Sequence, residues 1–368
     1  MSVFETRTRD CQQRLRDAGA AGAVLFPSPN LSYLAGFEET PSERHLLLFV
    51  PADGEPAFVA PALYEEQLDE ETWVADVRTY TDSEDPESLV AEVAEEKGLT
   101  GGELLVDPTM WARFTQSLRE TLPDATWALA DDVLAPLRVR KDDAELDALR
   151  CAGEAADAAM DDVRDLGADA VGMTERELAD YVADRLAAHG GTGVSFEVIT
   201  GSGPNGAKPH HTHGDREIEA GDPVVCDFGT RVDSYPSDQT RTVVFAGDPP
   251  AGFEAVHDVV REAQQAAVDA VKPGVTAGEV DAAARSVIDA AGYGDEFVHR
   301  TGHGVGLEVH EEPYIVAGSD RELEEGMVFS VEPGVYLPGE FGVRIEDLVA
   351  VTADGCERLN DSDRGWQA

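Results

Sequence analysis

The chain has 368 residues, of which 74 are Asp or Glu and 28 are Lys or Arg, so its formal net charge is −46. This balance excludes proteins that bind nucleic acid or anionic membranes through clustered basic residues, because both need Lys and Arg. With 42% hydrophobic residues the chain can still bury a core, so the acidity indicates a folded, halophilic protein whose surface suits a salt-rich cytosol.

The sequence lacks signals for membrane insertion or export. No stretch approaches the ~20 apolar residues of a membrane span, and no basic segment followed by an apolar one opens the chain. The four cysteines are widely separated and form no CxxC pair, which argues against disulfide frameworks and zinc fingers. We therefore expect a soluble, reduced, cytoplasmic protein.

The first third of the chain alternates short apolar runs with helical patterns. Four runs favour strands: residues 23–26, 45–50, 57–60 and 104–106. Between them lie acidic helical patterns such as residues 87–97. This alternation predicts an α/β layered domain over residues 1–135.

A long amphipathic helix is predicted to begin near Lys141. Leu146, Leu149 and Ala152 recur at helical spacing and so share one face. We place the domain boundary just before this helix, so the second domain covers residues 136–368.

Two similar segments of the second domain each contain Gly, then Thr, then Glu three residues after the Thr. Thr174 with Glu177, and Thr276 with Glu279, form the capping box that begins a helix. The recurrence either is a coincidence, since capping boxes are common, or marks two related half-domains whose interface would hold a site.

The first candidate for chemistry is a pair of acids on two neighbouring strands. The apolar runs around Asp227 and Asp238 favour a hairpin whose turn we expect to centre on Val232 and Asp233. That register makes the two acids direct cross-strand partners, with Cβ atoms roughly 4.5–5.5 Å apart. Facing like charges destabilise a hairpin unless a cation lies between them.

A second facing pair follows later in the chain. A turn centred on Gly339 places Glu332 opposite Glu346, and His303 lies in a glycine-rich run. One facing pair in so acidic a chain indicates a solvated edge, whereas two pairs inside apolar strands indicate a site. Four carboxylates and a neutral imidazole balance two divalent cations, and this oxygen-rich set suits Mn²⁺, Co²⁺, Fe²⁺ or Zn²⁺.

Six short motifs contain these acids. They read Asp227-Phe-Gly, Ser237-Asp-Gln-Thr-Arg-Thr, Gly302-His-Gly-Val-Gly, Val309-His-Glu-Glu-Pro313, Glu332-Pro-Gly and Arg344-Ile-Glu346. In order and spacing the series resembles the M24 pita-bread metallopeptidases, nearest the Xaa-Pro dipeptidases (prolidases) and Xaa-Pro aminopeptidases. The resemblance implies an α/β creatinase/prolidase N-terminal domain followed by an α+β pita-bread catalytic domain built from two pseudo-symmetric halves.

The resemblance also implies two divalent metal ions per subunit, with Mn²⁺ expected ahead of Co²⁺, Zn²⁺ or Fe²⁺. Five ligands are implied: Asp227, Asp238, His303, Glu332 and Glu346. Asp238 and Glu346 match positions that bridge both ions in the family. Asp227 matches a ligand of one ion, and His303 and Glu332 match ligands of the other.

Further residues around the metals match family positions. The resemblance implies that His210, in preference to the adjacent His211, lines the substrate site. His310 matches a histidine that hydrogen-bonds the reacting carbonyl. Arg344 matches an arginine that orders the acids, and Tyr336 matches a tyrosine near the same cluster.

The implied activity is metal-dependent hydrolysis of the peptide bond before proline in a di- or oligopeptide, with Glu332 as proton shuttle to the leaving nitrogen. A dipeptidase needs a cation for the free carboxylate, yet Tyr314 stands where many dipeptidases have arginine, so dipeptidase and aminopeptidase both remain open. Two alternatives are an amide hydrolase of the ectoine-hydrolase type and a pita-bread binding module without catalysis.

His257 and His299 lie in apolar surroundings and are predicted to be core histidines satisfied by one hydrogen bond.

We expect a homodimer supported by the N-terminal domain, as in relatives of this type.

Overall fold

The computed structural model describes residues 2–368, and the chain divides into two compact units, Met1–Arg138 and Val139–Ala368. The boundary expected at residue 135 lies in helix α6 (Asp131–Arg138), just before this division. Within residues 2–368 no helix combines the length and apolar character needed to cross a membrane.

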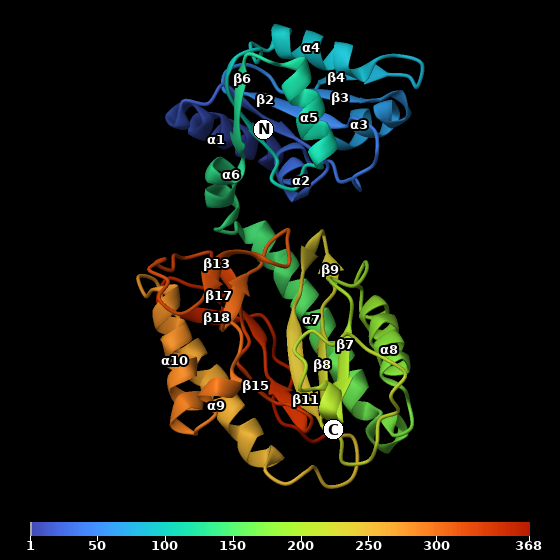
Figure 1. The fold of residues 1–368 in the computed structure, drawn as a ribbon, viewed down its shortest axis with the longest axis vertical. Coiled ribbons are helices and arrows are strands. Elements are labelled where there is room, and N and C mark those ends of the chain that lie inside the picture. The colour runs from blue at the N-terminus through green and yellow to red at the C-terminus, as the bar shows by residue number, and fades with distance from the viewer. Residues whose placement is uncertain (1) are drawn as a thin grey trace. The chain divides into compact units, whose positions relative to one another are not determined.

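The first unit is built on a six-stranded mixed sheet in the order β4-β3-β2-β1-β5-β6 (Figure 1). Its strands are β1 (Gly22–Leu25), β2 (Leu47–Pro51), β3 (Ala57–Pro61), β4 (Asp76–Tyr80), β5 (Gly102–Val106) and β6 (Ala125–Leu129). Its α-helices are α1 (Val3–Ala18), α2 (Pro29–Ala35), α3 (Glu65–Glu71), α4 (Pro86–Glu96), α5 (Ala112–Thr121) and α6, and η1 (Ala62–Tyr64) is a 3-10 turn.

The predicted α/β layers of this unit are confirmed. Strands β1, β2 and β3 are buried at every residue, which requires cover on both faces of the sheet. Val24 packs with Val93 of α4 and Phe114 of α5 in one core. The edge strands β4 and β6 are missing from the prediction, because both are half-exposed and carry polar residues.

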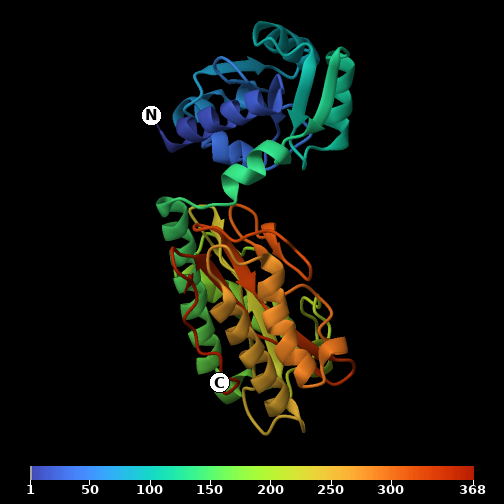
Figure 2. The same cartoon turned by 90° about the vertical axis from the view of Figure 1, so that its left-hand side faces the viewer.

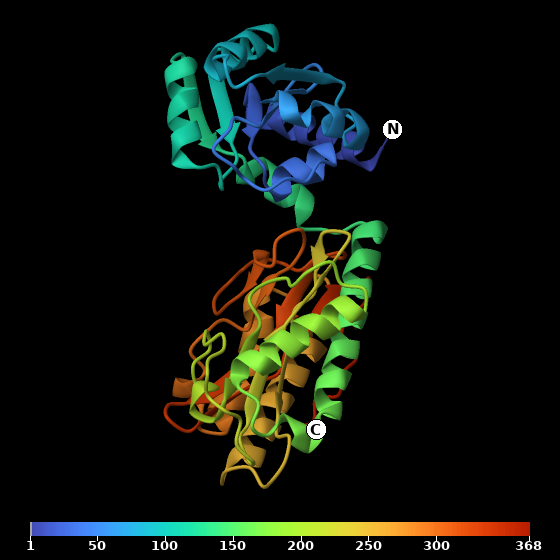
Figure 3. The same ribbon diagram turned by 90° about the vertical axis from the view of Figure 1, so that its right-hand side faces the viewer.

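The second unit contains two helix pairs that flank its strands, and Figures 2 and 3 look onto the α9–α10 pair and the α7–α8 pair respectively. The helices are α7 (Asp143–Asp165), α8 (Glu175–Ala188), α9 (Phe253–Ala270) and α10 (Ala277–Ala290), with 3-10 turns η2 (Gly167–Ala170), η3 (Gly203–Asn205) and η4 (Gly294–Glu296). The strands are β7 (Ile199–Ser202), β8 (Val224–Phe228), β9 (Arg231–Val232), β10 (Tyr235–Pro236), β11 (Gln239–Val243), β12 (Gly302–Gly304), β13 (Glu311–Ile315), β14 (Val328–Val331), β15 (Gly334–Leu337), β16 (Phe341–Arg344), β17 (Asp347–Val351) and β18 (Cys356–Arg358).

This unit repeats one plan twice, a helix pair followed by antiparallel strands. Both predicted capping boxes are present: Thr174 and Glu177 begin α8, and Thr276 and Glu279 begin α10. Each box therefore opens the second helix of its pair, which favours two related halves over coincidence. The sheet β11-β8-β7 belongs to the first half and β13-β12-β14-β17-β18 to the second.

The first hairpin register differs from the prediction. The turn lies at Asp233 and Ser234, both with positive φ, one residue later than expected. Asp227 consequently faces Thr240 rather than Asp238. Because moving the turn centre by one residue shifts the pairing by two, Asp238 keeps the same face of the sheet and becomes a diagonal neighbour of Asp227.

The second hairpin has the predicted turn. Strands β15 and β16 pair about Gly339, and the last pair of the ladder is Gly334 with Arg344. Glu332 and Glu346 lie just beyond that end, and Glu346 instead forms a bridge with Thr240 of β11. This bridge joins the strands of the two halves at the place where the acids gather.

Candidate metal centre

Two strands of the second unit, β8 and β12, and three segments that adjoin strands bring the predicted acids and His303 to one place. Asp238, His303 and Glu346 are all buried, and each offers a ligand atom within 4.8 Å of those of the other two. The Nε2 atom of His303 lies 3.7 Å from Asp238 Oδ2 and 3.5 Å from Glu332 Oε1. Asp227 lies on β8, directly across from Thr240.

These side chains line a cavity of about 580 Å³. Apolar and polar groups share its wall, as expected of a site for a small ligand. The lining residues are Phe196, Glu197, Ile199, Pro209, His210, Thr212, Asp227, Asp238, His299, Arg300, His303, Val309, His310, Glu332, Arg344 and Glu346.

The carboxylates are held where they disfavour one another's charge. Burial, and then repulsion from Glu346, raises the pKa of Asp238 well above its usual value. Burial and repulsion from Glu332 raise the pKa of Glu346 likewise, and burial raises that of Glu332 to about 7. Burial lowers the pKa of His303 to about 3, so its imidazole is a neutral potential ligand.

This donor set fits divalent cations. Asp227 Oδ1 is buried and makes no hydrogen bond to any described residue. Buried carboxylates of this kind need positive charge beside them, and carboxylate oxygens with one imidazole suit Mn²⁺, Co²⁺, Fe²⁺ or Zn²⁺. The residues present therefore fit the metal ions that the sequence resemblance implies.

Arg344 fixes the orientation of the acids on one side. Its Nη2 donates to Asp227 Oδ2, and its Nε donates to Thr240 Oγ1 at 3.0 Å. Thr240 Oγ1 in turn donates to Glu346 Oε2 at 2.6 Å. One guanidinium thereby holds Asp227 directly and Glu346 through a hydroxyl, consistent with the ordering role that the resemblance implies.

Of the two adjacent histidines, His210 lines the cavity, whereas His211 Nε2 lies 2.7 Å from Glu175 Oε2 outside it. His310 also lines the cavity, and its ring packs against that of His303 with centroids 4.1 Å apart. Both His210 and His310 are exposed.

Two cavity residues escaped the sequence analysis. His299, expected in the core, lines the cavity and places Nε2 2.8 Å from the Tyr336 hydroxyl. No local pattern identifies it, because bends at His299 and Thr301 separate it from the strand that carries His303. Arg300 also lines the cavity. His257 is buried as predicted, but neither ring nitrogen makes the expected hydrogen bond to a described residue.

Tyr336 is buried behind the cavity wall, where its hydroxyl contacts His299 and accepts from Arg344 Nη1 at 3.0 Å. Tyr336→Phe leaves both partners without this oxygen, so we expect the free energy of unfolding to fall by about 1–3 kcal/mol. Urea titration in molar KCl measures the loss. Tyr293→Phe is the control, since the Tyr293 hydroxyl makes no hydrogen bond within the described chain, and equal losses in both variants contradict the expectation.

Comparison with known proteins identifies the scaffold. The model of metallopeptidase family M24 matches residues 147–353, and that of the creatinase/prolidase N-terminal domain matches residues 7–140. A probable dipeptidase PepE of Mycobacterium tuberculosis is 44% identical, with 98% of this chain and 95% of that protein covered. An Xaa-Pro dipeptidase of Lactobacillus delbrueckii subsp. lactis is 40% identical, with 94% of each covered.

The fold agrees with the sequence relatives. The crystal structure of recombinant prolidase from Thermococcus sibiricus superposes with a TM-score of 0.94 at 39% identity, covering 100% of this chain and 99% of that one. The two-domain architecture predicted from the motifs is thereby confirmed. The chain belongs to metallopeptidase family M24, with a creatinase/prolidase N-terminal domain.

Proposed function

We propose that this metallopeptidase is an Xaa-Pro dipeptidase, which hydrolyses the peptide bond before a C-terminal proline. The observation that carries the proposal is the buried cluster of Asp238, His303 and Glu346 in the wall of the cavity. The relatives named Xaa-Pro dipeptidase and prolidase support the substrate class. Intact candidate ligands argue against a binding module without catalysis.

We assign the metal ligands as the family resemblance implies. Asp238 and Glu346 would contribute to both ion sites, Asp227 to one of them, and His303 and Glu332 to the other. When bound, two divalent cations supply an activated water near neutral pH and polarise a carbonyl oxygen. Mn²⁺ is the ion we propose first, and the alternatives are Co²⁺, Zn²⁺ and Fe²⁺.

The chain's own residues do the rest. His310 donates a hydrogen bond to the scissile carbonyl oxygen as negative charge develops on it, where a preorganised donor has its largest effect. Glu332 passes a proton to the leaving proline nitrogen. His210, which also lines the cavity, contacts the substrate, and Arg344, supported by Tyr336, keeps the acids in place.

A cation in the cavity favours the dipeptidase over the aminopeptidase. The Arg300 guanidinium lies 4.5 Å from the centre of the Tyr314 ring. No carboxylate of residues 2–368 lies within ion-pair distance of it, although its charge acts on Glu332 from farther away and the chain carries −46. A positive charge left unpaired in a substrate cavity suits the free carboxylate of Xaa-Pro. Arg300 would thus supply the charge that Tyr314 cannot.

Substrate length tests this proposal. Metal-stripped protein is reloaded with Mn²⁺ in molar KCl and given Ala-Pro or Ala-Pro-Ala, and released proline or Pro-Ala is quantified. Cleavage of Ala-Pro alone supports the dipeptidase. Equal cleavage of the tripeptide at Ala–Pro makes the protein an aminopeptidase. Failure to cleave either moves the assignment to a non-peptide amide hydrolase such as the ectoine-hydrolase type.

The role of Arg300 is tested separately. Arg300→Gln removes one charged partner of the carboxylate, so we expect KM for Ala-Pro to rise about 10- to 100-fold. Ala-Pro amide, which has no carboxylate, is expected to show the same KM with both proteins. Arg321→Gln, at an exposed arginine, is the control. An unchanged KM for Ala-Pro contradicts the role. A rise in KM seen only with Asp-Pro, whose first side chain carries a carboxylate, would mean that Arg300 binds that side chain and not the C-terminal carboxylate.

The homodimer, the cytoplasmic location and the adaptation to high salt stay predictions. The net charge of −46 supports the adaptation to high salt, because screening by salt relieves the repulsion among the protein's own charges. Light scattering across a KCl series measures subunit association and salt dependence together.

A further inference from the structure

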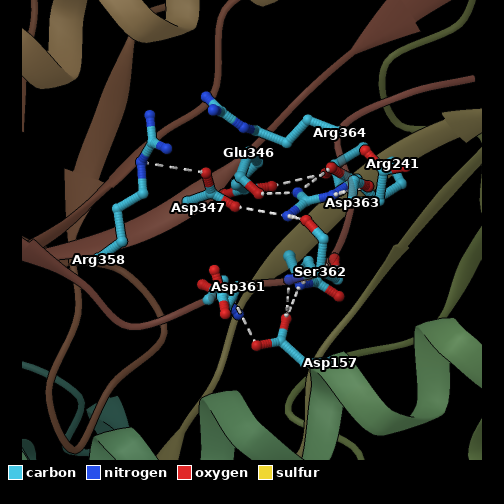
Figure 4. Close-up of polar contacts among 12 residues, drawn as sticks. Asp157, Arg241, Glu346, Asp347, Arg358, Asp361, Ser362, Asp363 and Arg364 are labelled. Atoms are coloured by element: carbon cyan, nitrogen blue, oxygen red, sulfur yellow. Dashed lines mark hydrogen bonds and ion pairs between the residues drawn. The ribbon is translucent and has the colours of Figure 1, made fainter.

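The largest fully buried side chain in the described part of the protein is Arg241, on the strand that follows Asp238. We propose that Arg241 and the C-terminal tail, residues 360–367, act together as a positioning device for the two bridging carboxylates, Asp238 and Glu346. Figure 4 shows the polar contacts of this region. The inference rests on the proposed function, since it takes those two acids as metal ligands.

Arg241 uses its full hydrogen-bonding capacity. Nη1 donates to the carbonyl oxygens of Thr240, at 2.9 Å, and Glu346, at 2.6 Å. Nη2 donates to Asp347 Oδ1 at 2.7 Å, and the tail accepts the remaining two bonds, through the Ser362 and Asp363 carbonyls at 3.0 and 3.1 Å. A guanidinium has five N–H groups in a rigid plane, so these five bonds leave it a single orientation.

In an extended chain, successive side chains point to opposite sides, and this applies to the segments that carry Asp238 and Glu346. Asp238 and Thr240 point toward the metal centre, and so Gln239 and Arg241 point to the opposite side, where the tail lies. The same alternation places Glu346 toward the centre and its neighbour, Asp347, behind it. Each bridging acid therefore has an adjacent residue that contacts the tail or its arginine.

Asp347 ties the Glu346 segment to helix α9. Its Oδ1 accepts from Arg241, and both side chains are 1% exposed. Its Oδ2 accepts from Gln264 of α9 at 2.9 Å and lies 3.6 Å from Arg358 Nε. A buried ion pair with its remaining lone pairs satisfied resists rotation of either partner.

The tail is anchored to helix α7 by Asp157. The Asp157 carboxylate accepts from the backbone N–H groups of Asp361 and Ser362 at 2.6 and 3.1 Å. It also accepts from Gln239 Nε2 at 2.5 Å, and that amide donates to Ser362 Oγ at 3.0 Å as well. The residue next to Asp238 and the tail thus share one anchor on α7.

These contacts join the segments that carry the two acids. Through Arg241 and Gln239 the tail contacts both β11 and the Glu346 segment, while Thr240 bonds Glu346 on the metal side. Groups behind metal ligands set the ligands' orientation, and altering them typically weakens metal binding about 10- to 100-fold. We therefore expect that loss of the tail contacts weakens binding of the two metal ions before it unfolds the protein.

The experiment titrates metal-free wild-type protein, Arg241→Lys and Asp157→Asn with Mn²⁺ by calorimetry in molar KCl. It also records the electron paramagnetic resonance spectrum of each protein with two Mn²⁺ added. Lysine keeps the charge of Arg241 but has three donors, and asparagine exchanges one acceptor oxygen of Asp157 for a donor. Asp161→Asn, on the exposed side of the same helix, is the matched control.

We expect Arg241→Lys to weaken binding of at least one Mn²⁺ about 10-fold or more and to change the spin-coupled spectrum, with Asp157→Asn shifting both in the same direction. Asp161→Asn should match wild type. Wild-type affinity and spectrum in both test variants overturn the inference while the proposed function stands. If Arg241→Lys does not fold, Asp157→Asn alone decides. If wild type binds no pair of Mn²⁺ ions, the proposed function itself fails, and the inference with it.

Discussion

Asp238→Asn is expected to lower kcat/KM for Ala-Pro by more than about 100-fold, beyond the effect of altering groups behind a metal ligand. The same substitution should raise the thermal stability of the metal-free protein at pH 8. Both effects have one cause: Asp238 is buried beside Glu346, so its charge serves metal binding and otherwise repels its neighbour. A loss of activity together with a gain in the stability of the metal-free protein distinguishes a metal ligand from a residue that merely supports the fold.

Glu346→Gln should behave in the same way, and metal content by mass spectrometry should fall in both variants. Glu340→Gln is the matched control, because Glu340 is an exposed acid in the turn of the hairpin that leads to Glu346. Full activity in either ligand variant contradicts the two-metal assignment. Lower metal-free stability in both ligand variants contradicts the repulsion argument.

The predicted hairpins show why the site could be located from sequence without its registers being known. Alternation combined with a turn centred on two residues puts Asp227 and Asp238 on one face, and that conclusion survives a shift of two positions in the pairing. The turn is harder to place, since Asp233 and Ser234 adopt positive φ although neither is glycine. Gly339, at the centre of the second hairpin, gives a clear turn signal and a correct register.

The surroundings of the acids depend on contacts between distant parts of the chain. Arg241 donates hydrogen bonds to the carbonyls of Ser362 and Asp363, more than a hundred residues away. The sequence around Arg241 does not predict that pairing. His299 was predicted to lie in the core because its neighbours are apolar, whereas the cavity that it lines exists only after several strands meet. Sequence patterns thus identify the acids, while tertiary contacts determine what orients them.

Metal removal is expected to make stability depend on pH above neutrality. Burial raises the pKa of Glu332 to about 7, and burial with mutual repulsion raises those of Asp238 and Glu346 well above their usual values. The folded metal-free protein therefore binds more protons than the unfolded chain, so its stability falls as pH rises through these folded-state values. Each such acid contributes a slope of up to about 1.4 kcal/mol per pH unit between its unfolded-state and folded-state pKa values, and none once it is ionised in both states, so Asp238 and Glu346 contribute more than Glu332 above pH 7.

The comparison begins at pH 7 because buried histidines act in the opposite direction below that point. Burial lowers the pKa of His303 to about 3 and that of His299 to about 4, so folding excludes protons that the unfolded chain binds below about pH 6.5. From pH 7 to 9 these histidines are neutral in both states. Burial raises the pKa values of Cys11 and Cys226 to about 12, so these thiols lower stability above about pH 8 with and without metal, and the carboxylates determine the difference between the two slopes.

We expect the melting temperature of EDTA-treated protein in molar KCl to fall between pH 7 and 9. With Mn²⁺ present the fall should be smaller, because ligands that are already deprotonated bind the ion more tightly and so offset part of the decline. Glu346→Gln removes one of the titrating acids, and so the metal-free variant should show a shallower decline than metal-free wild type. Parallel curves with and without Mn²⁺ would show that the raised pKa values and the metal site are unrelated. If EDTA produces the decline and Glu346→Gln reduces it, the raised pKa values and the metal site belong to the same cluster of acids.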